Sequence, residues 1–222
     1  MSLDNSDNRI HTESIRAEKV ECRRLAKGLL AETDAAYRAE ASAAICDTLL
    51  AMDEFRNAKT IFAYSSVGRE VSTDRILDAI LDSGKELCLP RCTDIGGDGR
   101  RIAGVPKMEA RYVSDLSLLE TGAYGIREPD DRTDDEGRQV FPLAEAMDID
   151  LVVLPCIACD SDCNRIGHGA GYYDRFLSEL RDDCVKIAIC FDKLILDHIP
   201  MEEHDMSVQA VISEKAVYRW RG

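Results

Sequence analysis

The chain has 222 residues, of which 45% are hydrophobic, and this is enough for one domain with an ordinary core. Its formal net charge of −14 disfavours a duplex nucleic-acid-binding protein, because such proteins need a basic surface. No run of about 18 apolar residues occurs, so no membrane-spanning helix is predicted. Nine cysteines, an odd number, without a signal peptide indicate reduced thiols and a cytoplasmic protein.

The N-terminal part of the chain predicts a flexible segment and then a helix. Residues 1–17 are polar, and we expect them to precede a single domain that spans 18–222. A helix is predicted from about Glu18 to Leu30. Its apolar residues recur at helical spacing, at Cys22, Leu25, Ala26 and Leu29. Basic residues four positions apart form an adjacent stripe, made of Lys19, Arg23 and Lys27.

The following elements alternate between helices and strands. In chain order we expect a helix over 35–51 with Ala41, Ile45 and Leu49 on its inner face, a strand over 59–64, a helix capped by Ser72 and ended by Gly84, a strand over 86–89 stopped by Pro90, a strand over 150–155, a helix over 172–180, and strands over 185–191 and 208–212.

Two loops separate these elements in the middle of the chain. Residues 96–99 predict a turn between two antiparallel strands, and the acidic residues 130–137 predict an exposed connection. Alternating strands and helices indicate an α/β fold, in which a largely parallel sheet is covered on both faces. Such sheets bind ligands beyond the carboxyl ends of their strands.

The glycine-rich turn at 167–171 is the most informative stretch. Three glycines at alternate positions let the backbone adopt positive φ and approach an anion ahead of a helix, whose first amides favour phosphate. Arg165 adds donors suited to phosphate oxygens, and Asp174 adds a carboxylate that could hold the magnesium of Mg-ATP. The alternative is a tight strand-to-helix turn that needs small residues only for packing.

Several motifs, in order along the chain, resemble the 5-formyltetrahydrofolate cyclo-ligase family. The stretch from Pro155 to Asp174 is similar to the signature P-G-x-A-F-D-x-x-G-x-R-L-G-x-G-x-G-Y-Y-D. Further similarity lies in the K-x-x-x-R of Lys19 and Arg23, the E-V-S-T from Glu70, the G-I-R-E-P from Gly125, the P-x-x-x-H-D that ends at Asp205, and Ser213-Glu214. The resemblance covers about Lys19 to Glu214, and several ordered matches are more specific than any one of them.

This resemblance implies a fold and a reaction. The fold would be a three-layer α/β/α arrangement with a mostly parallel central sheet, similar to the NagB/RpiA/CoA transferase-like fold. The reaction would be the ATP- and Mg2+-dependent closure of 5-formyltetrahydrofolate to 5,10-methenyltetrahydrofolate, with release of ADP and phosphate. Transfer of the γ-phosphoryl group to the formyl oxygen activates the formyl carbon, so that the 10-nitrogen can attack and phosphate can leave.

The resemblance also implies which residues form the site. Lys19 and Arg165 would be catalytic, and Asp174 and Asp205 would be ligands of Mg2+. ATP would be bound by Lys19, Arg23, Arg165, Gly167, His168, Gly169, Ala170, Gly171, Tyr172 and Tyr173. The folate would be bound by Ser65, Glu70, Tyr124, His168, Gly169, Ala170, Gly171 and Tyr172. From the residues alone, Lys19 and Arg23 also fit a solvated basic stripe, and Tyr124 and Tyr172 fit core packing.

Four residues depart from the family pattern. Cys159 replaces Phe, Cys163 replaces Gly, His168 replaces Tyr or Arg, and Lys193 replaces Gln. They bear on selectivity, and Cys163 also bears on the turn before Arg165. Cys156, Cys159 and Cys163 also fit a thiolate metal or iron–sulfur site, to which Cys88 and Cys92 could add ligands. Cysteine as a small hydrophobe at a buried strand end is the simpler interpretation and is favoured.

The predicted partners are small molecules. They are ATP and 5-formyltetrahydrofolate, with or without a polyglutamate tail, and we expect no nucleic acid, no membrane and a monomer. A relative that binds ATP or folate without turnover is the other functional class. The presence of Lys19, Arg23, Arg165 and Asp174 argues against it.

Overall fold

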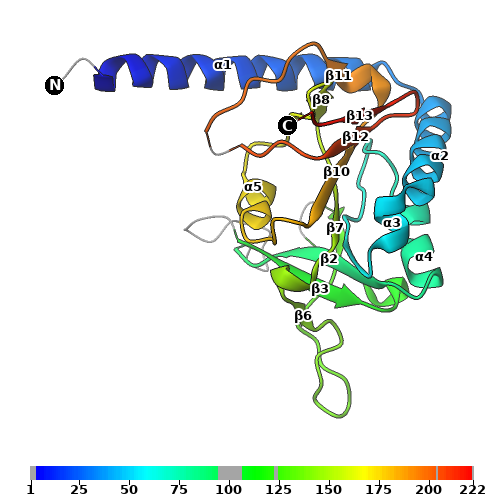
Figure 1. Ribbon diagram of the computed structural model, residues 1–222. Coiled ribbons are helices and arrows are strands. Elements are labelled where there is room, and N and C mark those ends of the chain that lie inside the picture. The colour runs from blue at the N-terminus through cyan, green and yellow to red at the C-terminus, as the bar shows by residue number, and fades with distance from the viewer. Residues whose placement is uncertain (1–3, 95–106, 123–124, 204, 222) are drawn as a thin grey trace.

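A computed structural model describes residues 4–94, 107–122, 125–203 and 205–221. Its central feature is an eight-stranded sheet with the strand order β13-β12-β10-β7-β1-β2-β3-β6 (Figure 1). Its strands are β1 (Thr60–Phe62), β2 (Glu86–Cys92), β3 (Met108–Val113), β6 (Leu143–Ala144), β7 (Leu151–Leu154), β10 (Val185–Ile189), β12 (Ala210–Ile212) and β13 (Val217–Arg219).

The sheet is mixed and mostly parallel. The five strands from β12 to β2 pair in parallel, whereas β13, β3 and β6 are antiparallel additions at the two sides. This confirms the predicted α/β class with a largely parallel sheet. Two smaller sheets join β11 (Ile195–Leu196), β8 (Ala158–Asp160) and β9 (Arg165–Ile166), and β4 (Glu120–Thr121) and β5 (Arg127–Glu128).

Helices lie on both sides of the sheet. In Figure 1, α2 (Ala35–Ala51), α3 (Asp53–Asn57) and α4 (Asp74–Asp82) lie on one side, and α5 (Tyr172–Leu177) lies on the other. The ring of Phe176 in α5 packs against Phe62 in β1 with centroids 4.6 Å apart, which fixes α5 beside the end of the sheet. Ala41, Ile45 and Leu49 are buried on the inner face of α2, as predicted.

Three local predictions are wrong. The first helix, α1 (Asp4–Ala31), begins well before Glu18, and its Leu25 is exposed. The division of the chain at residue 17 stays a prediction. The N-cap of α4 is Thr73, not Ser72, and no side chain caps this end. The Thr73 hydroxyl instead donates to the Tyr64 carbonyl (2.7 Å) and holds the loop after β1.

The third wrong prediction concerns Pro90, which does not stop its strand. β2 continues through it to Cys92 and pairs there with β3. β1 pairs with β2 only as far as Cys88. On the β1 side of Pro90 the described residues therefore include no neighbouring strand that would require a hydrogen bond from the N–H that proline lacks. The antiparallel pairing of β2 with β3 is confirmed, although the predicted turn at 96–99 lies outside the described residues.

Candidate active site

A cavity of about 1270 Å³ lies beyond the carboxyl ends of the parallel strands, where the topology predicts a ligand. This volume exceeds the roughly 300–1,000 Å³ typical of a single small-molecule site, so it has room for two ligands. Every predicted site residue that the structure describes lines the cavity. Tyr124, predicted on the substrate side, and His204 of the C-terminal motif lie outside the described residues.

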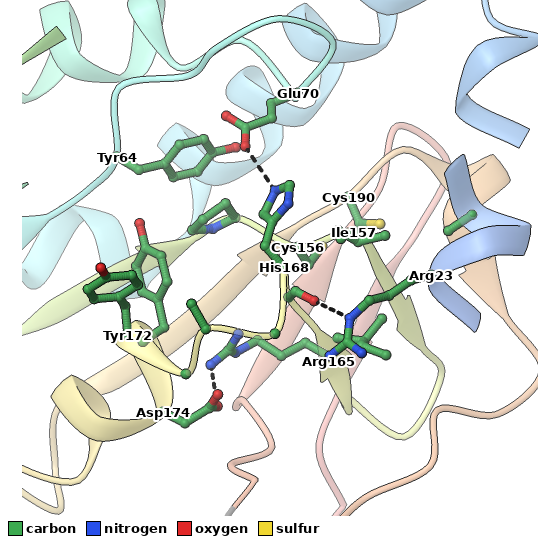
Figure 2. Close-up of a pocket in the computed structure, with 18 of the residues that line it drawn as sticks. Arg23, Tyr64, Glu70, Cys156, Ile157, Arg165, His168, Tyr172, Asp174 and Cys190 are labelled. Atoms are coloured by element: carbon green, nitrogen blue, oxygen red, sulfur yellow. Dashed lines mark hydrogen bonds and ion pairs between the residues drawn. The ribbon is translucent and has the colours of Figure 1, made fainter. Parts of the chain in front are cut away.

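The glycine-rich turn forms one wall of the cavity. Gly169 (φ +93°) and Gly171 (φ +72°) have left-handed backbones, and Gly171 is the N-cap of α5. A Cβ atom at Gly169 would lie 3.2 Å from Nη2 of Arg23, so the turn and this arginine pack closely. Nε of Arg23 donates to the Gly167 carbonyl at 2.8 Å, which ties α1 to the turn (Figure 2).

Arg165, in the short strand β9, extends its side chain beneath the turn. Its Nη2 donates to Oδ1 of Asp174 at 2.6 Å (Figure 2), and its guanidinium lies 5.9 Å from the ring centre of Tyr173. The residue is only 6% exposed, and its Nε has no hydrogen-bond partner among the described residues. Burial raises the pKa of Tyr173, which keeps its phenol neutral beside the cation. A buried guanidinium with an unused donor is suited to an anionic ligand.

Lys19 reaches the same cavity from α1. The residue is 7% exposed, and its Nζ donates to Oε2 of Glu202 (2.8 Å) and to Asp205. The alternative of a solvated basic stripe is therefore wrong for Lys19. Glu202, which also pairs with Arg16 (3.2 Å), was missed because no motif in the sequence marked it.

The opposite wall carries Ser65 and Glu70, two of the residues predicted to bind the folate. Ser65 is buried beyond the end of β1, and Oε2 of Glu70 accepts a hydrogen bond from the amide of Val67 (2.9 Å). His168 points from the turn toward Glu70, with Nε2 3.9 Å from Oε1 (Figure 2). The wall therefore presents a carboxylate that an incoming donor could reach.

Tyr172 belongs to the wall of the cavity and not to the hydrophobic core. Its hydroxyl donates to the carboxylate of Asp94, with both oxygens at 2.9 Å. Asp94 is buried, and no sequence motif marked it as a residue of the site. The contact fixes the orientation of the tyrosine ring at the edge of the cavity.

Cys163 stands in the turn before Arg165, at a position where the resembled family pattern has glycine. Its φ is +66°, so the cysteine itself adopts the left-handed conformation that glycine favours. Asp160 fastens this turn by accepting hydrogen bonds from the amides of Asp162 and Asn164. Arg165 thus keeps its place one residue beyond the turn.

The three cysteines that lie together in the structure are not the three that the sequence spacing suggested. Among the described residues, Cys156, Cys159 and Cys190 bring their sulfur atoms within 4.8 Å of one another. Cys163 is not part of this group, because the turn directs it into the core, and Cys88 and Cys92 are also outside it. Cys190 was missed, since it is far from the other two in the sequence.

Comparison with known proteins gives consistent matches. The model of the 5-formyltetrahydrofolate cyclo-ligase family matches residues 14–214. A probable 5-formyltetrahydrofolate cyclo-ligase of Schizosaccharomyces pombe is 28% identical over 191 residues, which cover 80% of this chain and 86% of that protein. The 5-formyltetrahydrofolate cyclo-ligase of Mus musculus is 29% identical over 192 residues, which cover 85% and 89%.

A solved structure is similar as well. The 5,10-methenyltetrahydrofolate synthetase of Aquifex aeolicus superposes with a TM-score of 0.71 at 25% identity, over 92% of this chain and 93% of that one. In the described part of the chain, no helix combines the length and apolar character that crossing a membrane would require.

The fold and the site define an α/β protein with a large ligand cavity at the carboxyl ends of its parallel strands. Within that class, the chain belongs to the 5-formyltetrahydrofolate cyclo-ligase family. Its activity is the conversion of 5-formyltetrahydrofolate to 5,10-methenyltetrahydrofolate in folate one-carbon metabolism, and the use of ATP follows from the family.

Proposed function

We propose that this cavity closes the folate ring by transferring the γ-phosphoryl group of ATP to the formyl oxygen, with Arg165 and Lys19 as the catalytic cations. The observation that carries the proposal is the buried guanidinium of Arg165, which lines the cavity on the same wall as the glycine-rich turn. A donor that is already in place and dehydrated stabilises developing charge without reorganisation.

Each catalytic cation is held by an acid of the cavity. Arg165 pairs with Asp174, and Lys19 pairs with Asp205. Arrival of ATP would exchange these partners, because phosphate oxygens can take the place of the carboxylates on both cations. Arg23 and the amides of residues 167–171 would hold the same phosphates, with Tyr173 packed behind Arg165.

Asp174 and Asp205 are suited to magnesium. Mg2+ prefers oxygen ligands and is held in most nucleotide sites by one or two carboxylates together with substrate phosphates. Both residues line the cavity, Asp174 from α5 and Asp205 from the segment between β11 and β12, so their carboxylates are available to an ion that arrives with the nucleotide. When bound, magnesium would offset the negative charge of the phosphates.

The folate would occupy the opposite wall. Glu70 would accept hydrogen bonds from the donor edge of the pterin, beside Ser65 and Tyr172. Tyr124 stays a proposed contact. His168, with a side chain 74% exposed, would meet the glutamate portion at the mouth of the cavity, where a single residue or a polyglutamate tail can extend.

The finer architecture and the setting are part of the proposal. The helices on both sides of the sheet support a three-layer arrangement of the NagB/RpiA/CoA transferase-like type. We expect a cytoplasmic monomer that binds neither nucleic acid nor membranes, in keeping with its net charge of −14.

The proposal is tested by following the near-ultraviolet absorbance of the methenyl product. Purified protein is mixed with (6S)-5-formyltetrahydrofolate and ATP, with and without magnesium, and an ATP-free sample is the control. A rise that requires both ATP and magnesium supports the proposal. Turnover that continues after complete chelation of magnesium would contradict it, and so would a flat trace from folded protein that binds ATP.

A further inference from the structure

A group of three thiols, Cys156, Cys159 and Cys190, adjoins the cavity and has no part in the mechanism above. Cys156 follows β7, Cys159 lies in the middle of β8 and Cys190 follows β10, so residues from three different parts of the chain converge on one point. The sulfur atoms all lie within 4.8 Å of one another, and those of Cys156 and Cys159 are 3.2 Å apart. Sulfurs bound to one Zn2+ lie roughly 3.8 Å apart, since each Zn–S bond is about 2.3 Å long. The spacing therefore requires only small adjustments.

We propose that Cys156, Cys159 and Cys190 form a three-thiolate site for a soft divalent cation of the zinc type. The group of donors contains sulfur only, which favours such a cation over the magnesium that accompanies ATP. Three thiolates carry three negative charges, and a divalent cation would leave only one.

The three thiols differ before any cation is bound. Hydrogen bonds from Cys159 and Cys190 lower the pKa of Cys156, whereas burial raises the pKa of Cys159 and the hydrogen bond with Cys156 raises that of Cys190, so binding of the cation would have to release protons. Thiolates are the form in which cysteine binds metals. The other contacts of these sulfurs are weak, since Cys156 and Cys190 reach only backbone carbonyls at 3.4 and 3.8 Å.

The cation would have a route to the site and an open position. Cys156 and Cys190 line the cavity (Figure 2), whereas Cys159 is fully buried and does not line it. An ion can therefore enter from the cavity and be held on its far side by a dry wall. Zinc sites with three protein ligands keep a fourth position for an exogenous ligand. Here that position would face the space between the two walls of the cavity.

The test is a zinc titration of the reduced, metal-free protein under argon, in competition with a chromophoric chelator. We expect one equivalent of Zn2+ per chain. Cys156→Ser, Cys159→Ser and Cys190→Ser should each weaken binding at least about 100-fold, because even the loss of an outer-shell partner costs 10–100-fold. Cys184→Ser is the matched control, since Cys184 is buried but lies outside the group, and it should bind zinc as the wild type does.

Two measurements on the wild type do not depend on the folding of any variant. Co2+ in place of Zn2+ should give thiolate-to-metal charge-transfer absorption of the strength expected for three sulfurs. Bound zinc should also slow the alkylation of Cys156, which is only half-buried, and should leave that of the half-buried Cys22 unchanged, as mapped by peptide mass spectrometry. Failure to bind stoichiometric zinc, or a site that protects other cysteines, would overturn the proposal. Neither result depends on cyclo-ligase turnover.

Discussion

Two arginine–aspartate pairs lie at opposite ends of the parallel strands. They differ in how many of their hydrogen-bonding atoms have partners. At the amino ends of β1 and β7, Asp150 accepts hydrogen bonds from the amides of Lys59 (2.8 Å) and Thr60 (3.0 Å) and from Arg181 (2.9 Å). At the carboxyl ends, Asp174 accepts from Arg165 at 2.6 Å.

The two arginines show the contrast most clearly. Arg181 uses all three nitrogens, because Nε donates to Asp183 (2.8 Å) and Nη1 to the Met147 carbonyl (2.8 Å) in addition to the bond with Asp150. Arg165 is more deeply buried, yet its Nε has no partner in the described part of the chain. An unsatisfied buried donor destabilises a protein by about 1–3 kcal/mol. The arginine at the amino end is therefore fully satisfied, whereas the arginine at the carboxyl end, beside the cavity, keeps an unsatisfied donor.

The largest expected effect is at Arg165. Arg165→Ala should lower kcat by about 10²–10³-fold, because removal of one preorganised donor to developing charge has this effect in other enzymes. The rise in methenyl absorbance at saturating ATP measures it. Arg181→Ala is the matched control and should keep a nearly normal kcat in its folded fraction. Equal kcat values for the two variants would remove the distinction between the ends of the sheet.

Asp150 should carry the larger share of stability. Asp150→Ala should lower the free energy of unfolding by about 2–3 kcal/mol, since it leaves two amides and Arg181 without an acceptor. Urea denaturation measures this change. The control is Asp183→Ala, because Asp183 is an exposed partner of the same arginine and should have little effect. A smaller loss at Asp150 than at Asp183 would contradict the structural role.

Asp150 should also make the free energy of unfolding depend on pH. Its hydrogen bonds with the amides and with Arg181 outweigh burial and lower the pKa of Asp150. Its stabilising effect is complete above the unfolded-state pKa of about 3.9 and is lost as the pH falls through the lower folded-state value. Urea unfolding as a function of pH should show this loss in the wild type, and a weaker one in Asp150→Asn. Identical acid profiles would remove Asp150 from the explanation.

Lys19 should affect ATP binding more than turnover. Lys19→Ala should raise the KM for ATP at least about tenfold, because it removes a charge-assisted contact and exposes ATP to Glu202 and Asp205. Arg24→Ala, on the exposed face of the same helix, is the control. An unchanged KM for Lys19→Ala would exclude a phosphate contact.

The smallest effect concerns the left-handed residue Cys163. Cys163→Gly should be more stable than Cys163→Ala by about 1 kcal/mol, because glycine adopts this backbone without the penalty that a Cβ atom brings. At Ala41, inside α2, glycine should instead destabilise by a similar amount. Thermal unfolding of the variants measures both differences, and a Gly variant less stable than the Ala variant at position 163 would contradict the backbone argument.

Much of the fold could be predicted because its elements carry local signals. Helix α2 was predicted with its observed bounds, since Ala41, Ile45 and Leu49 repeat at helical spacing. The start of α1 was missed because residues 4–17 have no apolar stripe. The N-cap was placed one residue too early, at Ser72, because the tertiary contacts of Thr73 are invisible in a sequence.

The residues of the site also fall into those that could be predicted from the sequence and those that could not. The glycine-rich turn and Arg165 could be predicted because they are contiguous and belong to a motif. Glu202, Asp94 and Cys190 could not, because each acquires its role only when distant segments meet. Spacing alone grouped Cys163 with Cys156 and Cys159, whereas a left-handed turn separates it from them.

The most direct test of the phosphoryl-transfer account is the fate of the formyl oxygen. 5-Formyltetrahydrofolate carrying oxygen-18 in its formyl group is converted with unlabelled ATP, and the released phosphate is analysed by mass spectrometry. The account predicts that the label appears in inorganic phosphate, because the oxygen leaves as part of the transferred group. Unlabelled phosphate, with the oxygen-18 recovered in water, would contradict it.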